Sequence, residues 1–387
     1  MKRSSDRILT THTGSLARPR ELLDLMKAKL KGEPYDEAGY AGEVRHAVSE
    51  IVRNQVECGI DVVNDGEQGK PGFATYIRER LAGFEARPPR PGPRTQWAAE
   101  VGAFPEYYEQ YFKQAMQGAA IAPRVTLVCT GPVSYRGQEA VQRDIENLKA
   151  ALQGVNAEEA FIPAVSPSGV GTNEYYGSDE EFVYAVAEAL RTEYQAIVEA
   201  GFILQVDEPS LTDYYNLDPS LSLAERRRAA EQRIDALNHA LRGIAPERVR
   251  YHTCYGINEG PRVHDTPMRE IVDLMLRVNA GAYSFEAANP RHEHEYHLWE
   301  QVKLPEGKVL IPGVVSHASN IVEHPELIAE RIERYGRLVG RENIIAGTDC
   351  GFSSQATYTP EVHPTVVWAK FRAMSEGARI ANKRLWA

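Results

Sequence analysis

The chain has 387 residues, of which 43% are hydrophobic and 25% are charged, an ordinary composition for a globular protein. Its 44 basic and 54 acidic residues give a formal net charge of -10, and no basic cluster carries interleaved aromatic residues, which argues against nucleic acid as a partner. No run has the length of a signal peptide or a membrane span. We therefore expect a cytoplasmic protein with no membrane association.

Short apolar runs rich in β-branched residues alternate with helical segments along the chain. Three of these segments, 180–200, 224–242 and 325–339, repeat apolar residues every three or four positions. This alternation is typical of βα units, and it predicts one (β/α)8 barrel spanning residues 1–387. A Rossmann sheet is the alternative, but no G-x-G-x-x-G follows the first strand. The nine candidate strands start at Ile8, Asp61, Val125, Phe161, Phe202, Val249, Ala282, Val309 and Asn343. Nine runs exceed eight barrel places, so one is misassigned or lies outside the barrel.

Residues 84–122 do not follow this alternation of strands and helices. The segment contains the proline-rich ARPPRPGPR and the aromatic EYYEQYF. Proline excludes a regular helix or a central strand from the first of these. We expect an insertion between the second and third strands, acting as a lid, as a contact in a homo-oligomer, or as a plain surface excursion.

Four residues with metal-binding side chains lie at predicted strand ends: His252, Cys254, Glu286 and Cys350. His252 and Cys254 are two positions apart and point the same way from a strand. In a parallel barrel the strand ends converge on one mouth, where such barrels keep their active sites. Two thiolates, an imidazole and a carboxylate suit Zn²⁺. The sequence therefore predicts a zinc site, whereas Cys58 and Cys129 lack partner motifs and are expected in the core.

This ligand set favours one type of zinc chemistry. Two thiolates make zinc a weaker electrophile and better suited to hold a third sulfur atom. A coordinated thiol is deprotonated, and the thiolate is the reactive nucleophile. The expected chemistry is alkylation of a thiol substrate. A structural zinc is the alternative, although structural sites usually use closely spaced cysteines.

Several motifs in order resemble the cobalamin-independent methionine synthase superfamily, specifically its catalytic barrel, which is similar in fold to uroporphyrinogen decarboxylase. The resemblance covers nearly the whole chain. It is carried by ILTTHTGSLARP from Ile8, NDGEQGK from Asn64, VDEPSL from Val206, HTC, FEAA, TDCG, and GVVSHASNIVE from Gly313. It implies that His252, Cys254, Glu286 and Cys350 bind zinc. The long members carry a second barrel that this chain lacks.

The resemblance also implies roles for further residues. Ser15 and Glu67 would anchor the amino-acid part of a thiol substrate, homocysteine being favoured. Asp207 would share the substrate ammonium group and belong to the catalytic set, and His12 would line the pocket or serve a structural role. His317 would act as the general acid, because a poor leaving group must be protonated as it departs.

Three functions remain open from the sequence. The first is a zinc-dependent methyltransferase acting on a small thiol, with folate or another compound as the methyl donor. The segment from Pro290 to Ile332 also resembles the short branch that contains epoxyalkane:coenzyme M transferase, which joins a small thiol to an epoxide. The third is a barrel with structural zinc that binds a ligand without turnover.

Overall fold

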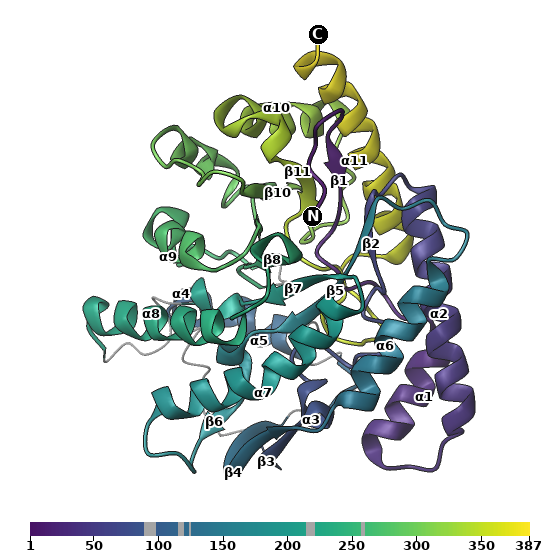
Figure 1. Ribbon diagram of the computed structural model, residues 1–387, viewed down its shortest axis with the longest axis vertical. Coiled ribbons are helices and arrows are strands. Elements are labelled where there is room, and N and C mark those ends of the chain that lie inside the picture. Colours follow the sequence, from purple (N-terminus) through teal and green to yellow (C-terminus); the bar gives the residue numbers. More distant parts are fainter. Residues whose placement is uncertain (89–97, 115–119, 124, 214–220, 257–259) are drawn as a thin grey trace.

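The computed structural model describes residues 1–88, 98–114, 120–123, 125–213, 221–256 and 260–387 (Figure 1). Eight parallel strands form one sheet in the order β1-β11-β10-β9-β8-β7-β5-β2. A parallel bridge between Thr11 and Val62 joins the first strand of this order to the last, so the sheet closes into a barrel. The strands are β1 (Leu9–Thr10), β2 (Val62–Asn64), β5 (Glu159–Val165), β7 (Ile203–Asp207), β8 (Val249–His252), β9 (Ala282–Phe285), β10 (Val309–Val315) and β11 (Ile345–Thr348). The predicted fold class is confirmed.

Helices surround the barrel strands (Figure 1). The three helices predicted from apolar spacing are present as α7 (Asp179–Glu199), α8 (Leu223–Ala240) and α10 (Pro325–Val339), with ends within two residues of those expected. Ser178 and Ser222 cap α7 and α8 by accepting backbone N–H groups, which explains where these two helices begin. Outside the insertion, the remaining α-helices among the described residues are α1 (Arg20–Lys31), α2 (Glu37–Glu57), α3 (Ile77–Arg80), α6 (Gln138–Ala151), α9 (Val272–Arg277) and α11 (Pro364–Leu385).

The ninth predicted strand lies outside the barrel. The run starting at Val125 forms β4 (Thr126–Tyr135), which pairs antiparallel with β3 (Leu81–Arg87) and parallel with β6 (Thr172–Asn173). This small sheet lies at the lower edge of the view in Figure 1, away from the barrel strands. The expectation of one surplus run is confirmed. Hydrophobic content alone did not separate β4 from the barrel strands, because β4 also buries Val128 and Cys129.

The insertion contributes two short helices near the barrel mouth, α4 (Ala98–Ala103) and α5 (Pro105–Gln114). Glu100 on α4 accepts the backbone N–H of His264, in the loop after β8, at 3.2 Å. Tyr111 on α5 donates its hydroxyl to Glu361, in the segment after β11. Residues 89–97, which include most of the proline-rich run, lie outside the described residues. The insertion therefore contacts loops that follow two barrel strands.

The interior of the barrel is apolar at the end where the strands begin. Two clusters of buried side chains there, Leu9, Ala282, Val309, Ile311 and Ile345, and Val62, Phe161 and Ile203, both pack against Met1. Alternate residues on the same strands, such as Leu204 and Tyr283, join the large core shared with the helices. We call these two clusters with Met1 the barrel floor. Above this floor the lumen becomes polar, beginning with the buried Arg250, whose guanidinium lies 4.0 Å from the centroid of the Phe161 ring.

Candidate metal centre and substrate site

His252, Cys254 and Cys350 meet at the C-terminal mouth of the barrel. The three side chains are buried, and their ligand atoms all lie within 4.8 Å of one another. His252 ends β8, Cys254 follows two residues later, and Cys350 comes two residues after the end of β11. Strand alternation directs His252 and Cys254 to the same side, as expected from their spacing. Residues almost a hundred positions apart thus form one compact group of two sulfurs and one imidazole.

The three side chains of this group shift one another's pKa. The hydrogen bond with Cys350 and the nearby His252 hold the pKa of Cys254 well below its usual range, despite burial. The same bond, together with burial, raises the pKa of Cys350. Burial lowers the pKa of His252, but Asp207 and Cys254 more than reverse this and bring it to about 10. These interactions favour a negative charge on one sulfur next to a positive charge, and a bound cation would supply that positive charge.

Asp207 orients the His252 ring. Its Oδ1 lies 2.9 Å from His252 Nδ1, and the same oxygen accepts a hydrogen bond from Gln205 Nε2 at 2.8 Å. The other ring nitrogen, Nε2, is buried and has no hydrogen-bond partner of normal geometry among the described residues. A ring held by a carboxylate with its second nitrogen free is the usual arrangement of a metal-binding histidine. The donor set and this unpaired atom both fit a bound metal ion.

Glu286 lies beside this group but belongs to a second cluster, in which its carboxylate, His317 and Asp349 lie within 4.8 Å of one another. Glu286 Oε1 accepts the Tyr255 N–H at 2.7 Å, and Oε2 accepts from Asn289 Nδ2 at 2.7 Å. Both carboxylate oxygens therefore already have donors in this structure. The sequence predicted that Glu286 binds the metal together with His252, Cys254 and Cys350. In this structure Glu286 belongs to the neighbouring cluster instead.

Asp349 ties this second cluster to the barrel. Its Oδ1 accepts the backbone N–H groups of Ala287 and Ala288 at 2.7 and 2.8 Å, and its Oδ2 accepts from Asn289 at 3.0 Å. These bonds link the ends of β9 and β11. The residue before Cys350 thus fixes the backbone that follows Glu286.

His317 is buried next to Glu286 and Asp349. Its Nε2 lies 3.3 Å from the Gly256 carbonyl oxygen, and its Nδ1 has no hydrogen-bond partner among the described residues. Burial lowers the pKa of His317, and Asp349 only partly opposes this shift. A general acid of near-neutral pKa was expected from the sequence. The ring is thus harder to protonate here than a free imidazole, and it would need a proton before it could act as the acid.

A buried ion pair holds the loop that carries His317. Glu323 accepts the Ser316 N–H at 2.7 Å and pairs with Lys370 of α11 at 2.9 Å. Lys370 is fully buried, and it also donates to the Ile321 carbonyl. Because a buried pair tolerates little displacement, it restrains the backbone beside His317.

Gly14, Ser15, Glu67 and Asp207 form a second polar region of the mouth. Gly14 has φ 140°, and a Cβ there would lie 3.3 Å from Glu67 Oε1, so the absent side chain lets the β1 loop approach this carboxylate. Ser15 Oγ lies against Gly351, the residue after Cys350. Ser15 therefore lies between this second polar region and the cysteine group.

Glu67 is held in an unusual conformation. Its φ is 55°, a strained value for a non-glycine residue, and Arg18 fixes its carbonyl with a 2.8 Å hydrogen bond. Its Oε2 is buried and has no hydrogen-bond partner among the described residues. Burial raises the pKa of Glu67 to about 7; Lys70 opposes this shift and Asp207 adds to it. Two carboxylates close together with a free oxygen would attract a cationic group.

His12 lies apart from this carboxylate pair in its described contacts. Its Nε2 is 2.8 Å from Gln55 Oε1 on α2, and its ring packs against Phe161 and Phe371. Burial lowers the pKa of His12 to about 3, so the ring is neutral. These contacts favour the structural role over a pocket lining. Cys58 and Cys129 are buried in the hydrophobic core, as predicted.

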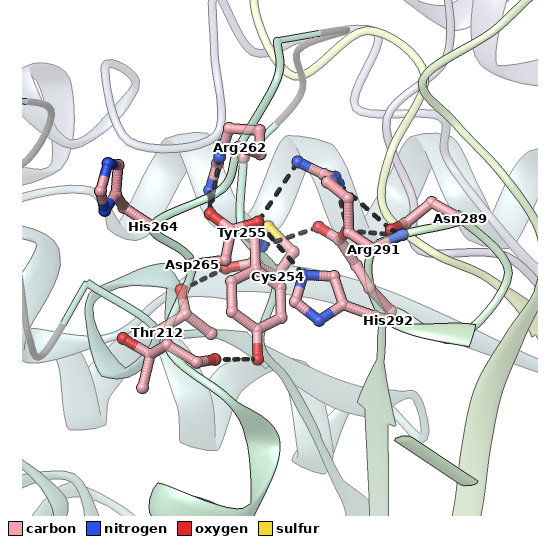
Figure 2. A network of polar contacts seen from close by, with 12 residues as sticks. Thr212, Cys254, Tyr255, Arg262, His264, Asp265, Asn289, Arg291 and His292 are labelled. Atoms are coloured by element: carbon pink, nitrogen blue, oxygen red, sulfur yellow. Dashed lines mark hydrogen bonds and ion pairs between the residues drawn. The ribbon is translucent and has the colours of Figure 1, made fainter. Parts of the chain in front are cut away.

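The structure adds a charged network that no sequence motif indicated. Arg291 reaches Glu286 Oε2 at 3.2 Å and Asp265 Oδ2 at 3.4 Å (Figure 2). His292 lies between Asp265 and Glu295, and its ring stacks on Tyr255 with 3.8 Å between centroids. The charged run PRHEHEYH, residues 290–297, belongs to the same segment. It forms a 3-10 helix over Glu293–Glu300, and His292 before it is buried.

Comparison with known proteins shows which protein family this chain resembles. Residues 174–370, just over half of the chain, match the family described as "Cobalamin-independent synthase, Catalytic domain". Methionine synthases from Thermococcus kodakarensis and Sulfurisphaera tokodaii are 22% and 29% identical over 382 and 387 residues. Each match covers 97% of this chain, and 94% and 93% of the respective relative.

A solved structure supports the same fold. The B12-independent methionine synthase from Shewanella sp. W3-18-1, in complex with selenomethionine, superposes with a TM-score of 0.72 at 19% identity. The superposition covers 98% of this chain and 99% of that chain. In the part of the chain that the structure describes, no helix combines the length and apolar character needed to cross a bilayer. On the family match, with the barrel fold that accompanies it, this chain belongs to the cobalamin-independent synthase family.

Proposed function

We propose that this protein is a zinc-dependent methyltransferase that transfers a methyl group to the sulfur of homocysteine. The observation that carries the proposal is the group of His252, Cys254 and Cys350, buried beside a pair of carboxylates. The methionine synthase relatives point to the same acceptor. We infer that the protein works in the cytoplasm on small molecules.

The metal would be held by His252 Nε2, Cys254 and Cys350, with Glu286 as the fourth ligand. Two sulfurs and an imidazole favour zinc over magnesium or calcium, which prefer oxygen ligands. Zinc, when bound, lowers the pKa of a coordinated thiol so that a thiolate is present at neutral pH. The remaining steps depend on side chains of the chain itself.

Glu67 and Asp207 bind the ammonium group of homocysteine, and Ser15 contacts the same amino-acid portion. Ser15 lies against Gly351, so a substrate held there has its sulfur directed towards the cysteine group. During transfer the bond between the methyl carbon and the donor breaks and a carbon–sulfur bond forms. The departing donor atom takes a proton from His317.

The carboxylate pair also discriminates between the two enzyme functions. An acidic pair attracts an ammonium group and repels the sulfonate of coenzyme M. Epoxide opening with coenzyme M is therefore less well supported than methyl transfer to an amino-acid thiol. The same pair has no evident use in a barrel whose zinc is only structural.

A binding experiment with three thiols tests the proposal. Homocysteine, 4-sulfanylbutanoate, which lacks the ammonium group, and coenzyme M are titrated into the zinc-loaded protein by calorimetry in two buffers, so that proton release is measured. We expect proton release with homocysteine and at least tenfold weaker binding of the other two. The Glu67→Gln variant should reduce the preference for homocysteine. Equal affinities for the three thiols would contradict the assignment of the acceptor.

A further inference from the structure

Arg18 is a buried arginine whose hydrogen bonds go to backbone carbonyl groups. It lies in the loop between β1 and α1 and is only 5% exposed. Its Nη2 donates to the carbonyl oxygens of Glu67 and Lys70, both at 2.8 Å, and its Nη1 donates to that of Ser353 at 2.5 Å. A buried charge is costly unless its donors are satisfied, so these bonds restrict where the three carbonyl groups can lie.

The three carbonyl groups belong to two loops that hold opposite ends of the proposed substrate site. Glu67 and Lys70 follow β2, and Glu67 is one of the two carboxylates assigned above to the ammonium group. Ser353 follows β11, three residues after the proposed metal ligand Cys350. Strand β1 lies between these two strands, since it pairs with β11 and meets β2 through the Thr11–Val62 bridge. Arg18 therefore connects the ammonium end of the site to its sulfur end.

The strained backbone of Glu67 makes this connection important. A residue with a φ of 55° that is not glycine keeps this conformation only where its surroundings impose it. Asp65 Oδ1 accepts the Glu67 N–H at 2.9 Å, and Arg18 holds the Glu67 carbonyl. The loop after β11 is fixed to the same region, because Phe352 donates its N–H to the Ser15 carbonyl at 3.0 Å. The direction of the Glu67 side chain is thus set by these contacts.

We propose that Arg18 is a positioning residue that fixes the separation between the Glu67 carboxylate and the Cys350 end of the metal group. This separation would determine the length of the amino-acid thiol that fits, and so select homocysteine over cysteine. The inference rests on the proposed function. The two thiols carry the same ammonium and carboxylate groups and differ by one methylene before the sulfur. With both loops held, the shorter thiol cannot place its ammonium group at Glu67 and its sulfur at the metal group at once.

The test compares homocysteine and cysteine as ligands of the zinc-loaded full-length protein, by calorimetry with proton release measured. The unaltered protein should prefer homocysteine by at least about tenfold, in line with the effect of one methylene in a fitted site. Arg18→Lys keeps the charge but replaces the planar fork with a single ammonium group, which cannot hold carbonyls of both loops in the same geometry. We expect its preference to fall below about threefold, with unchanged zinc content.

Arg331→Lys is the matched control. Arg331 is similarly buried, at 6% exposure, and donates to the Val314 carbonyl at 3.0 Å from the outer helix α10. Its replacement should leave the preference for homocysteine unchanged.

Gln68→Met is a second variant that decides the question if Arg18→Lys does not fold. Gln68 Nε2 donates to the Leu16 carbonyl at 3.2 Å, so it joins the loops after β1 and β2 without carrying a charge. Gln68→Met should lower the preference for homocysteine at least about threefold. An unchanged preference in folded Arg18→Lys, or in Gln68→Met where Arg18→Lys does not fold, would overturn the inference. An equal loss in Arg331→Lys would also overturn it.

The pH dependence of homocysteine binding separates geometry from charge. Burial raises the pKa of Glu67, and the charge of Arg18 opposes this shift. Because Arg18→Lys retains the charge, the midpoint of the pH dependence should stay in place while the preference falls. A shifted midpoint with an unchanged preference would contradict the positioning role. If the unaltered protein binds homocysteine with proton release and Arg18→Lys keeps the full preference, the inference is wrong and the proposed function stands. If neither thiol releases protons from the unaltered protein, the proposed function itself fails.

Discussion

The two ends of the barrel lumen show opposite chemistry on the same eight strands. At the floor, Phe161, Ile203 and Ile311 pack with Met1 in an apolar cluster. At the mouth, Asp207, His252 and Glu286 are equally buried but carry charges that need partners. A side chain at the floor is stabilised by exclusion from water, whereas one at the mouth is tolerated only because neighbours compensate its charge. The floor therefore supports stability, and the mouth supports function.

The largest effect is expected from removing a sulfur ligand at the mouth. Cys350→Ser should abolish stoichiometric zinc binding and methyl transfer, because a hydroxyl is a far weaker zinc ligand than a thiolate. Metal analysis of the purified protein measures the zinc content. Cys58→Ser is the matched control, since Cys58 lies in the outer core. Full zinc content in Cys350→Ser would show that Cys350 is not a metal ligand.

His317→Gln should slow methyl transfer by roughly 10²- to 10⁴-fold, as expected for loss of a general acid. Zinc content and homocysteine affinity should stay close to those of the unaltered protein, because His317 hydrogen-bonds only the Gly256 carbonyl among its described contacts. Single-turnover kinetics with zinc-loaded protein checks the transfer step. An unchanged rate would exclude the acid role.

Glu67→Gln should raise the KM for homocysteine roughly tenfold to a hundredfold, the usual range for loss of a charged hydrogen bond. Because burial raises the pKa of Glu67 to about 7, the ionised form that attracts an ammonium group increases as the pH rises through this value. The KM for homocysteine should therefore fall between about pH 6 and pH 8 in the unaltered protein. A pH dependence that persists in Glu67→Gln would have to come from another group.

The smallest effect on activity is expected at the floor. Ile311→Ala should lower the free energy of unfolding by about 2–5 kcal/mol by leaving a cavity. The kcat and KM should remain near those of the unaltered protein, since Ile311 belongs to the apolar floor cluster and not to the polar mouth. Denaturant unfolding and steady-state kinetics measure the two quantities. A large loss of kcat in a folded Ile311→Ala variant would break the division between floor and mouth.

The strand pattern was sufficient to predict the barrel and the convergence of His252, Cys254 and Cys350. Both follow from local rules. Side chains two positions apart on a strand point to the same side, and parallel strands in a barrel end at the same mouth. The surplus strand could not be identified in advance. β4 has the same apolar character as the barrel strands, and only its antiparallel pairing with β3 excludes it.

The sequence by itself thus determined the fold class, the side-chain types at the strand ends and the burial of Cys58 and Cys129. Only the tertiary structure decided which groups become partners. In the folded chain, Asp207 hydrogen-bonds His252, and Glu286 interacts with Asn289 and Arg291. Burial raises the pKa of Glu67 and lowers that of His317. The physical reason is that pairing and pKa depend on distances of a few ångströms between residues far apart in the chain, which residue spacing does not specify.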